Sequence, residues 1–226
     1  MSDRGGHLII TADDWGYSAR YDEGILEALD AGALDAVSAM VTRPGFDPEP
    51  LFQSGVEVGL HVEAPDSETA SELRAAPARQ AQEFEAAFGR VPAYIDGHRH
   101  CHATLPLAPA VEDLALELEV GVRPVGADHR MRLIERGVRC VDRIVGRMEE
   151  REPAPPPEIS EAVETGELPA GTTEWVVHPG HSDPASGSSY DRGREQDLAV
   201  ILSLADEAAL TRARTTHAEA LRAPVR

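Results

Sequence analysis

Short apolar segments recur along the chain of 226 residues, and stretches with helical spacing lie between them. The segments at 7–12, 56–63, 93–96 and 173–178 contain or lead into aspartate or histidine near their ends. Alternation of strand and helix is typical of a parallel sheet, whose active site lies at the carboxyl ends of its strands. The sequence therefore predicts an α/β fold, a single-domain barrel-like (β/α) structure over 1–226 with parallel strands and a site at their C-terminal ends.

The remaining elements follow from the same patterns. We expect further strands at 36–41 and 120–125, a helix from Ser18 to near Gly32, and helices over 68–88 and around 111–118 and 198–202. Apolar residues spaced alternately by three and four from Met131 to Met148 predict one packed outer helix. We interpret the Pro-rich stretch 152–157 as a loop or crossover, and 207–226 as a weak strand followed by a helix.

The charge balance restricts the class of partner. The chain has 40 acidic residues against 21 basic ones, all of them arginine, for a formal charge of -19. A field of this sign repels nucleic acid and anionic membranes, so a neutral or cationic small molecule is the expected partner. Cys101 and Cys140 form no CxxC motif, and the sequence shows neither a signal-peptide pattern nor a long apolar run. These features predict free thiols, a reducing compartment and a cytoplasmic protein.

A histidine cluster is the densest candidate site. Asp96, His98, His100 and His102 stand at alternate positions, so in an extended chain their side chains would share one face. His98 and His102 would then lie about 13 Å apart, too far for one metal ion. A single ion would be bound by His98, with or without His100. The other side chains of the cluster would then contact the metal ligands or a substrate. Imidazole at this density indicates metal-ligand chemistry.

Consecutive carboxylates follow the first apolar segment. Asp13 and Asp14 point in different directions, so one can ligate a cation while the other faces the substrate as a base. Two histidines and one carboxylate around a divalent ion are typical of a hydrolytic site, because they leave positions open for water and substrate. Each residue also has a structural interpretation: Asp14 as a helix N-cap, His61 or His178 as a buried hydrogen-bonded histidine, and Arg123 as a carboxylate partner.

Together these motifs resemble the YdjC family of carbohydrate deacetylases, which includes chito-oligosaccharide deacetylases. The resemblance keeps family order over 12–18, 24–25 with Gly32, 59–61, 88–92, 95–102 and 174–180. It implies a barrel-like (β/α) fold and one divalent metal ion, Mg²⁺ or Zn²⁺. The implied ligands are Asp14, His61 and His98, with Asp13 as the general base that activates water and His178 as the acid for the departing amine.

The resemblance further implies removal of an acetyl group from an N-acetylated amino sugar or related carbohydrate. His102 and His181 remain alternatives for the acid. Residues expected to contact the substrate or support the ligands are Asp96, His100, His102, Arg123, Glu174 and His181. Asp22 stands where the family usually has asparagine, and the segment between His61 and the histidine cluster is short, which favours a smaller or differently shaped acylated substrate.

Other functions fit part of the same pattern. A different metal-dependent hydrolase, such as an amidohydrolase or a phosphoesterase, also carries histidines at strand ends. A non-catalytic metal- or sugar-binding regulator of the same fold is the alternative outside enzymes, although pure binding requires no separate base such as Asp13. The expected partner is a small carbohydrate, and exposed apolar stripes would also allow a homodimer.

Overall fold

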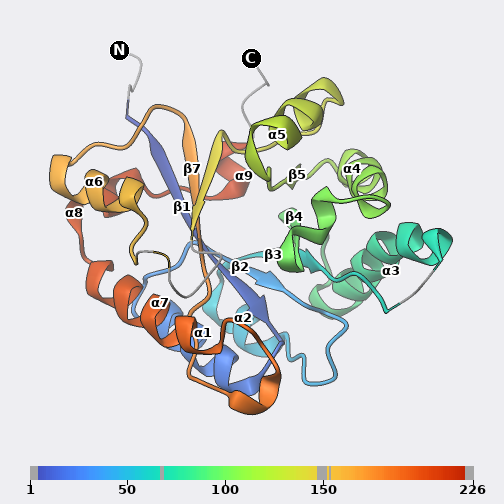
Figure 1. The fold of residues 1–226 in the computed structure, drawn as a ribbon, viewed down its shortest axis with the longest axis horizontal. Helices are drawn as coiled ribbons and strands as arrows, with labels where there is room; N and C mark the ends of the chain where they lie inside the picture. Colours follow the sequence, from blue (N-terminus) through green and yellow to red (C-terminus); the bar gives the residue numbers. More distant parts are fainter. Residues whose placement is uncertain (1–4, 67–68, 147–151, 153, 222–226) are drawn as a thin grey trace.

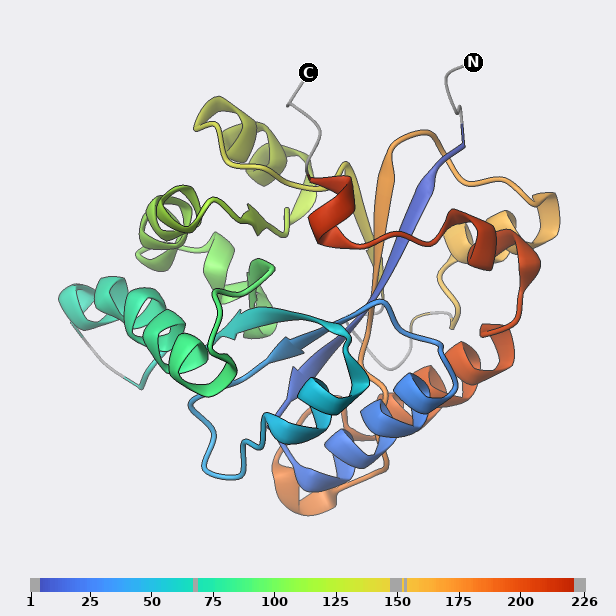
Figure 2. The same ribbon diagram turned by 180° about the vertical axis from the view of Figure 1, so that it is seen from behind.

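The computed structural model describes residues 5–66, 69–146, 152 and 154–221. Its strands form one seven-stranded sheet in the order β5-β4-β3-β2-β1-β7-β6, and every neighbouring pair is parallel. The sheet curls into a half-barrel surrounded by helices (Figures 1 and 2). The predicted α/β fold with parallel, barrel-like strands is therefore confirmed. Among the described strands, β5 and β6 are the two edges and do not pair with each other.

The strands are short and the helices vary in length. The strands are β1 His7–Trp15, β2 Ala36–Ala39, β3 Glu57–Val62, β4 Tyr94–Gly97, β5 Gly121–Val122, β6 Arg143–Gly146 and β7 Thr172–Val177. The helices are α1 Ala19–Asp30, α2 Glu49–Ser54, α3 Ala70–Phe88, α4 Leu107–Leu118, α5 Gly126–Glu135, α6 Pro157–Thr165, α7 Asp191–Leu204, α8 Ala208–Ala213 and α9 His217–Ala220. In the described part of the chain, no helix is both long and apolar enough to cross a membrane.

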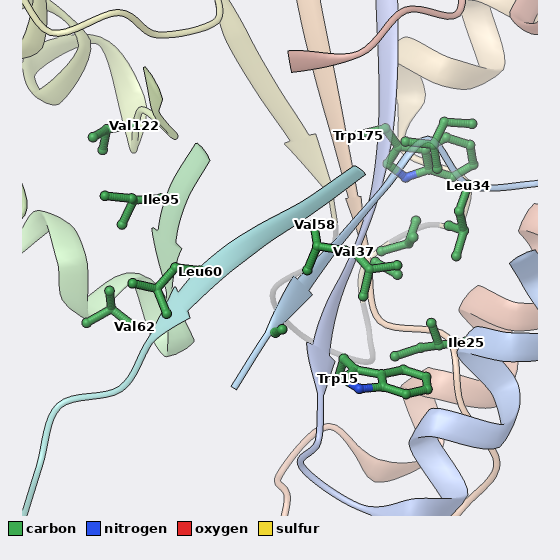
Figure 3. Close-up of a cluster of buried hydrophobic side chains, with 14 of the residues drawn as sticks. Trp15, Ile25, Leu34, Val37, Val58, Leu60, Val62, Ile95, Val122 and Trp175 are labelled. Atoms are coloured by element: carbon green, nitrogen blue, oxygen red, sulfur yellow. The ribbon is translucent and has the colours of Figure 1, made fainter. Parts of the chain in front are cut away.

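Side chains alternate between two different environments along each strand. Leu8, Ile10 and Ala12 of β1 belong to the main apolar cluster, whereas Thr11 and Asp13 are buried polar residues on the opposite face. The apolar face packs on the surrounding helices. Figure 3 shows this cluster, which joins six strands to α1 and the segment before β2: Trp15, Ile25, Leu34, Val37, Val58, Leu60, Val62, Ile95, Val122 and Trp175. The inner face of the curl is consequently free to carry polar chemistry.

Helix α1 lies close against the segment that follows β7. A Cβ atom on Gly24 would lie 2.5 Å from Gly180 Cα, so the two backbones can approach only because Gly24 has no side chain. The helix begins after Ser18, whose hydroxyl accepts a hydrogen bond from Arg20 N at 3.3 Å. This packing places the loop after β7 beside the C-terminal end of β1.

Two predictions of secondary structure are wrong. The expected helix from Met131 to Met148 ends at Glu135, because Gly137 adopts a left-handed conformation (φ 78°), and β6 follows as an edge strand. Met148 lies outside the described residues. In place of the weak strand expected within 207–226, the described residues up to 221 form an isolated bridge between Arg214 and Leu8, flanked by α8 and α9.

Cys101 and Cys140 are free thiols, as predicted. The cytoplasmic location, the single-domain extent and the homodimer stay predictions.

Candidate active site

The end of β1 is irregular where the two aspartates lie. The pairing of β1 with β2 shifts register between Ala12 and Trp15, and Asp14 has a φ of 73°. A bulge of this kind re-aims side chains, and a non-glycine residue with positive φ is uncommon and found at functional sites. As a result Asp13 and Asp14 face different partners, as the sequence predicted.

Asp14 meets two histidines from neighbouring strands. Its Oδ1 lies 3.2 Å from Nε2 of His61, on β3, and 2.9 Å from Nδ1 of His98, just after β4. One ligand-type atom from each residue falls within 4.8 Å of the other two. Asp14 and His61 are buried and His98 is partly exposed. These three side chains could hold a metal ion that remains accessible from one side.

His61 is oriented by the carboxylate of Asp96. The imidazole Nδ1 lies 2.7 Å from Asp96 Oδ1, and the hydroxyl of Ser38 donates to Asp96 Oδ2 at 2.7 Å. Burial alone would raise the pKa of Asp96, but the charges of Arg123 and His61 hold it below its ordinary value. An ionised Asp96 accepts a hydrogen bond from Nδ1, which directs Nε2 of His61 toward Asp14. Burial would lower the pKa of His61, but Asp96, Asp13 and Asp14 raise it well above its ordinary value, so Nε2 must lose a proton before it can ligate a metal ion.

Arg123 joins three carboxylates inside the half-barrel. Its Nη1 and Nη2 donate to the two oxygens of Asp13 at 2.7 and 2.9 Å, and Nη2 lies 2.7 Å from Asp96 Oδ2. Nε and Nη2 also donate to Glu174 Oε1 at 3.0 and 2.8 Å. Burial would raise the pKa of Glu174, but the Arg123 charge lowers it to about 2. The guanidinium thus fixes Asp13 in place by a bidentate contact.

Arg194 is a site residue that the sequence did not reveal. From α7 its Nη2 donates to Asp14 Oδ2 at 2.5 Å, and its guanidinium lies 3.8 Å from the ring centre of Tyr21. Burial would raise the pKa of Asp14, but Arg194 and the hydrogen bonds from His61 and His98 hold it well below its usual range. In the sequence Arg194 looks like any helix-surface cation, because only the packing of α7 against α1 brings it to β1.

A cavity of about 460 Å³ opens over these groups. Six residues predicted from sequence line it, namely Asp13, Asp14, His61, His98, His100 and His178. The rest of its wall includes Arg99, Arg194 and the serines and tyrosine of 188–190, none of which the sequence analysis singled out. Hydroxyl groups beside a charged floor suit a polar, neutral ligand such as a sugar.

The histidine cluster is not extended, contrary to prediction. β4 ends at Gly97, and His98–Ala103 forms a 3₁₀ turn in which Arg99 and His100 have φ values of 51° and 57°. The turn therefore separates the side chains that were expected to share one face. His102 is buried, with Nε2 3.0 Å from the carbonyl oxygen of Arg123, and burial lowers its pKa to about 3.

The histidines after β7 also separate. His178 lines the cavity, and its backbone N–H donates to Asp197 Oδ2 at 3.0 Å. Burial lowers the pKa of His178, so its imidazole is neutral at neutral pH and can accept a proton. His181 is not among the residues that line the cavity, and its Nε2 lies 3.4 Å from Glu27 Oε2 on α1. Of the three candidates for the acid, only His178 reaches the cavity.

The sequence model of the family described as YdjC-like protein matches residues 7–72 and 62–212. The chain belongs to this family. It is 26% identical to a carbohydrate deacetylase of Geobacillus stearothermophilus, over 86% of this chain and 89% of that protein. It is 31% identical to a carbohydrate deacetylase of Brevibacillus brevis, over 51% of this chain and 58% of that protein.

Solved structures agree on the architecture. A putative cellobiose-phosphate cleavage protein from Enterococcus faecalis, 18% identical, superposes with a TM-score of 0.77 over 96% of this chain and 99% of that one. A peptidoglycan N-acetylglucosamine deacetylase, 12% identical, superposes with a TM-score of 0.53 over 97% of this chain and 90% of that one. At these identities the likeness establishes the fold of this YdjC-like chain.

Proposed function

We propose that this protein is a divalent-metal-dependent hydrolase that removes the acetyl group from an N-acetylated amino sugar or a related carbohydrate. The observation that carries the proposal is the convergence of Asp14, His61 and His98 at the floor of a cavity that also exposes the carboxylate of Asp13. The carbohydrate deacetylases among its relatives support the choice of reaction.

The side chains present fit a divalent ion. One carboxylate and two imidazoles are a set that Zn²⁺ accepts readily, and Asp96 orients His61 so that its Nε2 faces Asp14 and can ligate once it is deprotonated. Mg²⁺ prefers more oxygen ligands, so we favour Zn²⁺. When bound, such an ion would polarise the amide carbonyl and lower the pKa of a water molecule.

Asp13 is the proposed general base. It lines the cavity beside Asp14, and the bidentate contact with Arg123 fixes the direction of its oxygens. A carboxylate held in this way can take a proton from the attacking water without having to reorganise. Arg123 also provides the charge that compensates for burying this carboxylate.

His178 is the proposed acid. It directly follows β7, which pairs with β1, and it lines the same cavity as Asp13. Its imidazole is neutral at rest because burial lowers its pKa. It would therefore accept the proton that Asp13 removes from the attacking water and pass it to the nitrogen of the departing amine, which could not leave as an anion.

Acetate release from a panel of N-acetylated sugars tests the proposal. The protein is purified without chelator and assayed as isolated, after chelation, and after addition of Zn²⁺ or Mg²⁺, with a phosphate ester in parallel. We expect acetate release that chelation abolishes and a divalent ion restores. Turnover of the phosphate ester alone would replace the proposal by a phosphoesterase, and binding of metal without any turnover would favour a non-catalytic binding protein.

The Asp13→Asn variant tests the assignment of the base. Asparagine keeps the size of the side chain but accepts no proton, so acetate release should fall by about 100-fold or more. Metal content should be retained, because Asp13 is not one of the proposed ligands. Unchanged acetate release would remove Asp13 as the base.

A further inference from the structure

His217 enters the half-barrel from the end opposite to the cavity. It is 2% exposed and begins the short helix α9. The neighbouring Thr215 donates its backbone N–H to Leu8 O at 2.9 Å, near the start of β1. Figure 2 shows α9 beside the end of the sheet at which β1 begins. The proposed reaction as described so far assigns no role to this buried histidine.

Two acidic residues surround the imidazole. Nδ1 of His217 lies 2.9 Å from Glu57 Oε2 on β3, and Nε2 lies 3.4 Å from Glu174 Oε1 on β7. Burial would lower the pKa of His217, but the charges of Glu174 and Glu57 and the hydrogen bond to Glu57 raise it to about 9. The ring also stacks on Tyr94 of β4, with centroids 3.8 Å apart. His217 is therefore an imidazolium at neutral pH.

The contacts continue from His217 to the floor of the cavity. Glu174 Oε1, which faces His217, also accepts hydrogen bonds from Arg123, and Arg123 holds both oxygens of Asp13. Glu174 Oε2 is buried and has no hydrogen-bond partner among the described residues. The charge of Glu174 is therefore balanced by two cations, Arg123 on one side and His217 on the other.

A second chain of contacts leads to the proposed metal ligand. The Tyr94 hydroxyl lies 2.9 Å from the hydroxyl of Ser38, which donates to Asp96. Asp96 in turn orients His61. A Cβ atom on Gly59 would lie 2.3 Å from the Tyr94 ring, so glycine at this position lets the ring lie across β3 and reach His217.

We infer that His217 is a positioning residue, whose imidazolium balances Glu174 and so allows Arg123 to hold the base Asp13. If His217 were uncharged, Glu174 would either draw Arg123 away from Asp13 or take up a proton. Each change alters the pairing of Arg123 with Asp13. The inference rests on the proposed function, because Asp13 is a base only in that reaction.

The test uses two variants and a matched control. His217→Gln keeps a hydrogen-bonding side chain but removes the charge, and Glu57→Gln keeps His217 while removing one of the charges that raise its pKa. Glu219→Gln, on the exposed side of the same helix, is the control. The assays are the pH dependence of kcat and KM for acetate release, an NMR titration of the His217 ring, and the NMR signal of the Arg123 Nε–H.

We expect kcat to fall by about 10- to 100-fold in His217→Gln with KM and metal content unchanged, as for a misplaced catalytic group. In the wild type a basic limb should coincide with the titration of His217 near pH 9. It should move to lower pH in Glu57→Gln and stay in place in Glu219→Gln. The groups facing His217 are Glu57, Glu174 and Tyr94. The charge of His217 also acts on Asp35, in the segment before β2, where burial raises the pKa of the carboxyl and the charge of His217 opposes that rise.

Two results would overturn the inference: kcat within twofold of the wild type in His217→Gln with an unmoved basic limb, or an Arg123 Nε–H signal that is the same in both proteins. The NMR signal separates this inference from the proposed function. If the wild type releases no acetate from any sugar, the proposed function fails, whereas a shifted Arg123 signal in His217→Gln would still show the coupling between His217 and Arg123.

Discussion

Arg123→Met is the perturbation that the structure predicts most sharply. Methionine fills much of the same volume but leaves the buried carboxylates of Asp13, Asp96 and Glu174 without the guanidinium that now contacts all three. Breaking one buried ion pair by removing a partner costs about 3–5 kcal/mol. The three pairs share one cation and cannot be summed, so we expect a loss of at least ~3–5 kcal/mol in the free energy of unfolding, or about 6–20 °C in Tm.

Urea unfolding followed by tryptophan fluorescence measures this loss, because Trp15 and Trp175 are both buried. The control is Arg130→Met. Arg130 pairs with Asp142 at 2.6 Å at the surface, with about a third or more of each side chain exposed. Removing such a pair should cost at most about 1 kcal/mol. A loss below ~1 kcal/mol in Arg123→Met would refute the view that its charge holds the interior together.

The pH dependence of the free energy of unfolding tests the same prediction. In the wild type the pKa of Glu174 is about 2, below its ordinary value of 4.5, so its pairing stabilises the fold above pH 4.5 and this stability is lost as the pH falls toward 2. In Arg123→Met the desolvated carboxylates should instead have raised pKa values. The variant should therefore recover stability as the pH falls from 7, and its deficit relative to the wild type should shrink. A deficit independent of pH would contradict this reasoning.

Three further predictions address the site. Asp96→Asn should lower the divalent-ion affinity about 10- to 100-fold, measured by isothermal titration calorimetry, because His61 loses the carboxylate that fixes its tautomer; an unchanged affinity would contradict that role. His178→Ala should reduce kcat by about 100-fold or more with metal content retained, whereas His181→Ala should leave kcat unchanged. Asp22→Asn should stabilise the protein at pH 8 by ~1–3 kcal/mol and have little effect near pH 4 in urea unfolding. Burial raises the pKa of Asp22 from 3.8 to about 7, so the cost of its charge in the folded state grows as the pH rises from about 4 to 7; equal effects at both pH values would refute this.

Most of the site floor was predictable because it depends on strand ends. Asp14 and His61 lie near the C-terminal ends of β1 and β3, and His98 directly follows β4. Parallel strands bring these ends to one edge of the sheet. The period-two alternation then places Asp13 on the inner face of the curl. The local sequence and the parallel strand topology are therefore enough to predict that these side chains lie close together, as they do in the structure.

The rest depends on long-range packing that local patterns do not encode. The left-handed residues Arg99 and His100 turn the histidine cluster away from the extended geometry that alternate spacing suggests. Arg194 and His217 lie on helices far along the chain and meet the interior only when α7 and α9 pack. The single helix predicted over 131–148 was wrong because the apolar residues of α5 and of the following strand β6 continue the same three- and four-residue spacing.

Metal content per chain tests the central claim most directly. Elemental analysis of the wild type, purified without chelator and then supplied with Zn²⁺ or Mg²⁺, should find about one divalent ion per chain. The ion should be lost in Asp14→Ala and retained in Asp13→Asn. Absence of a stoichiometric ion in the wild type after supplementation, or its retention in Asp14→Ala, would contradict the assignment of Asp14, His61 and His98 as a metal site.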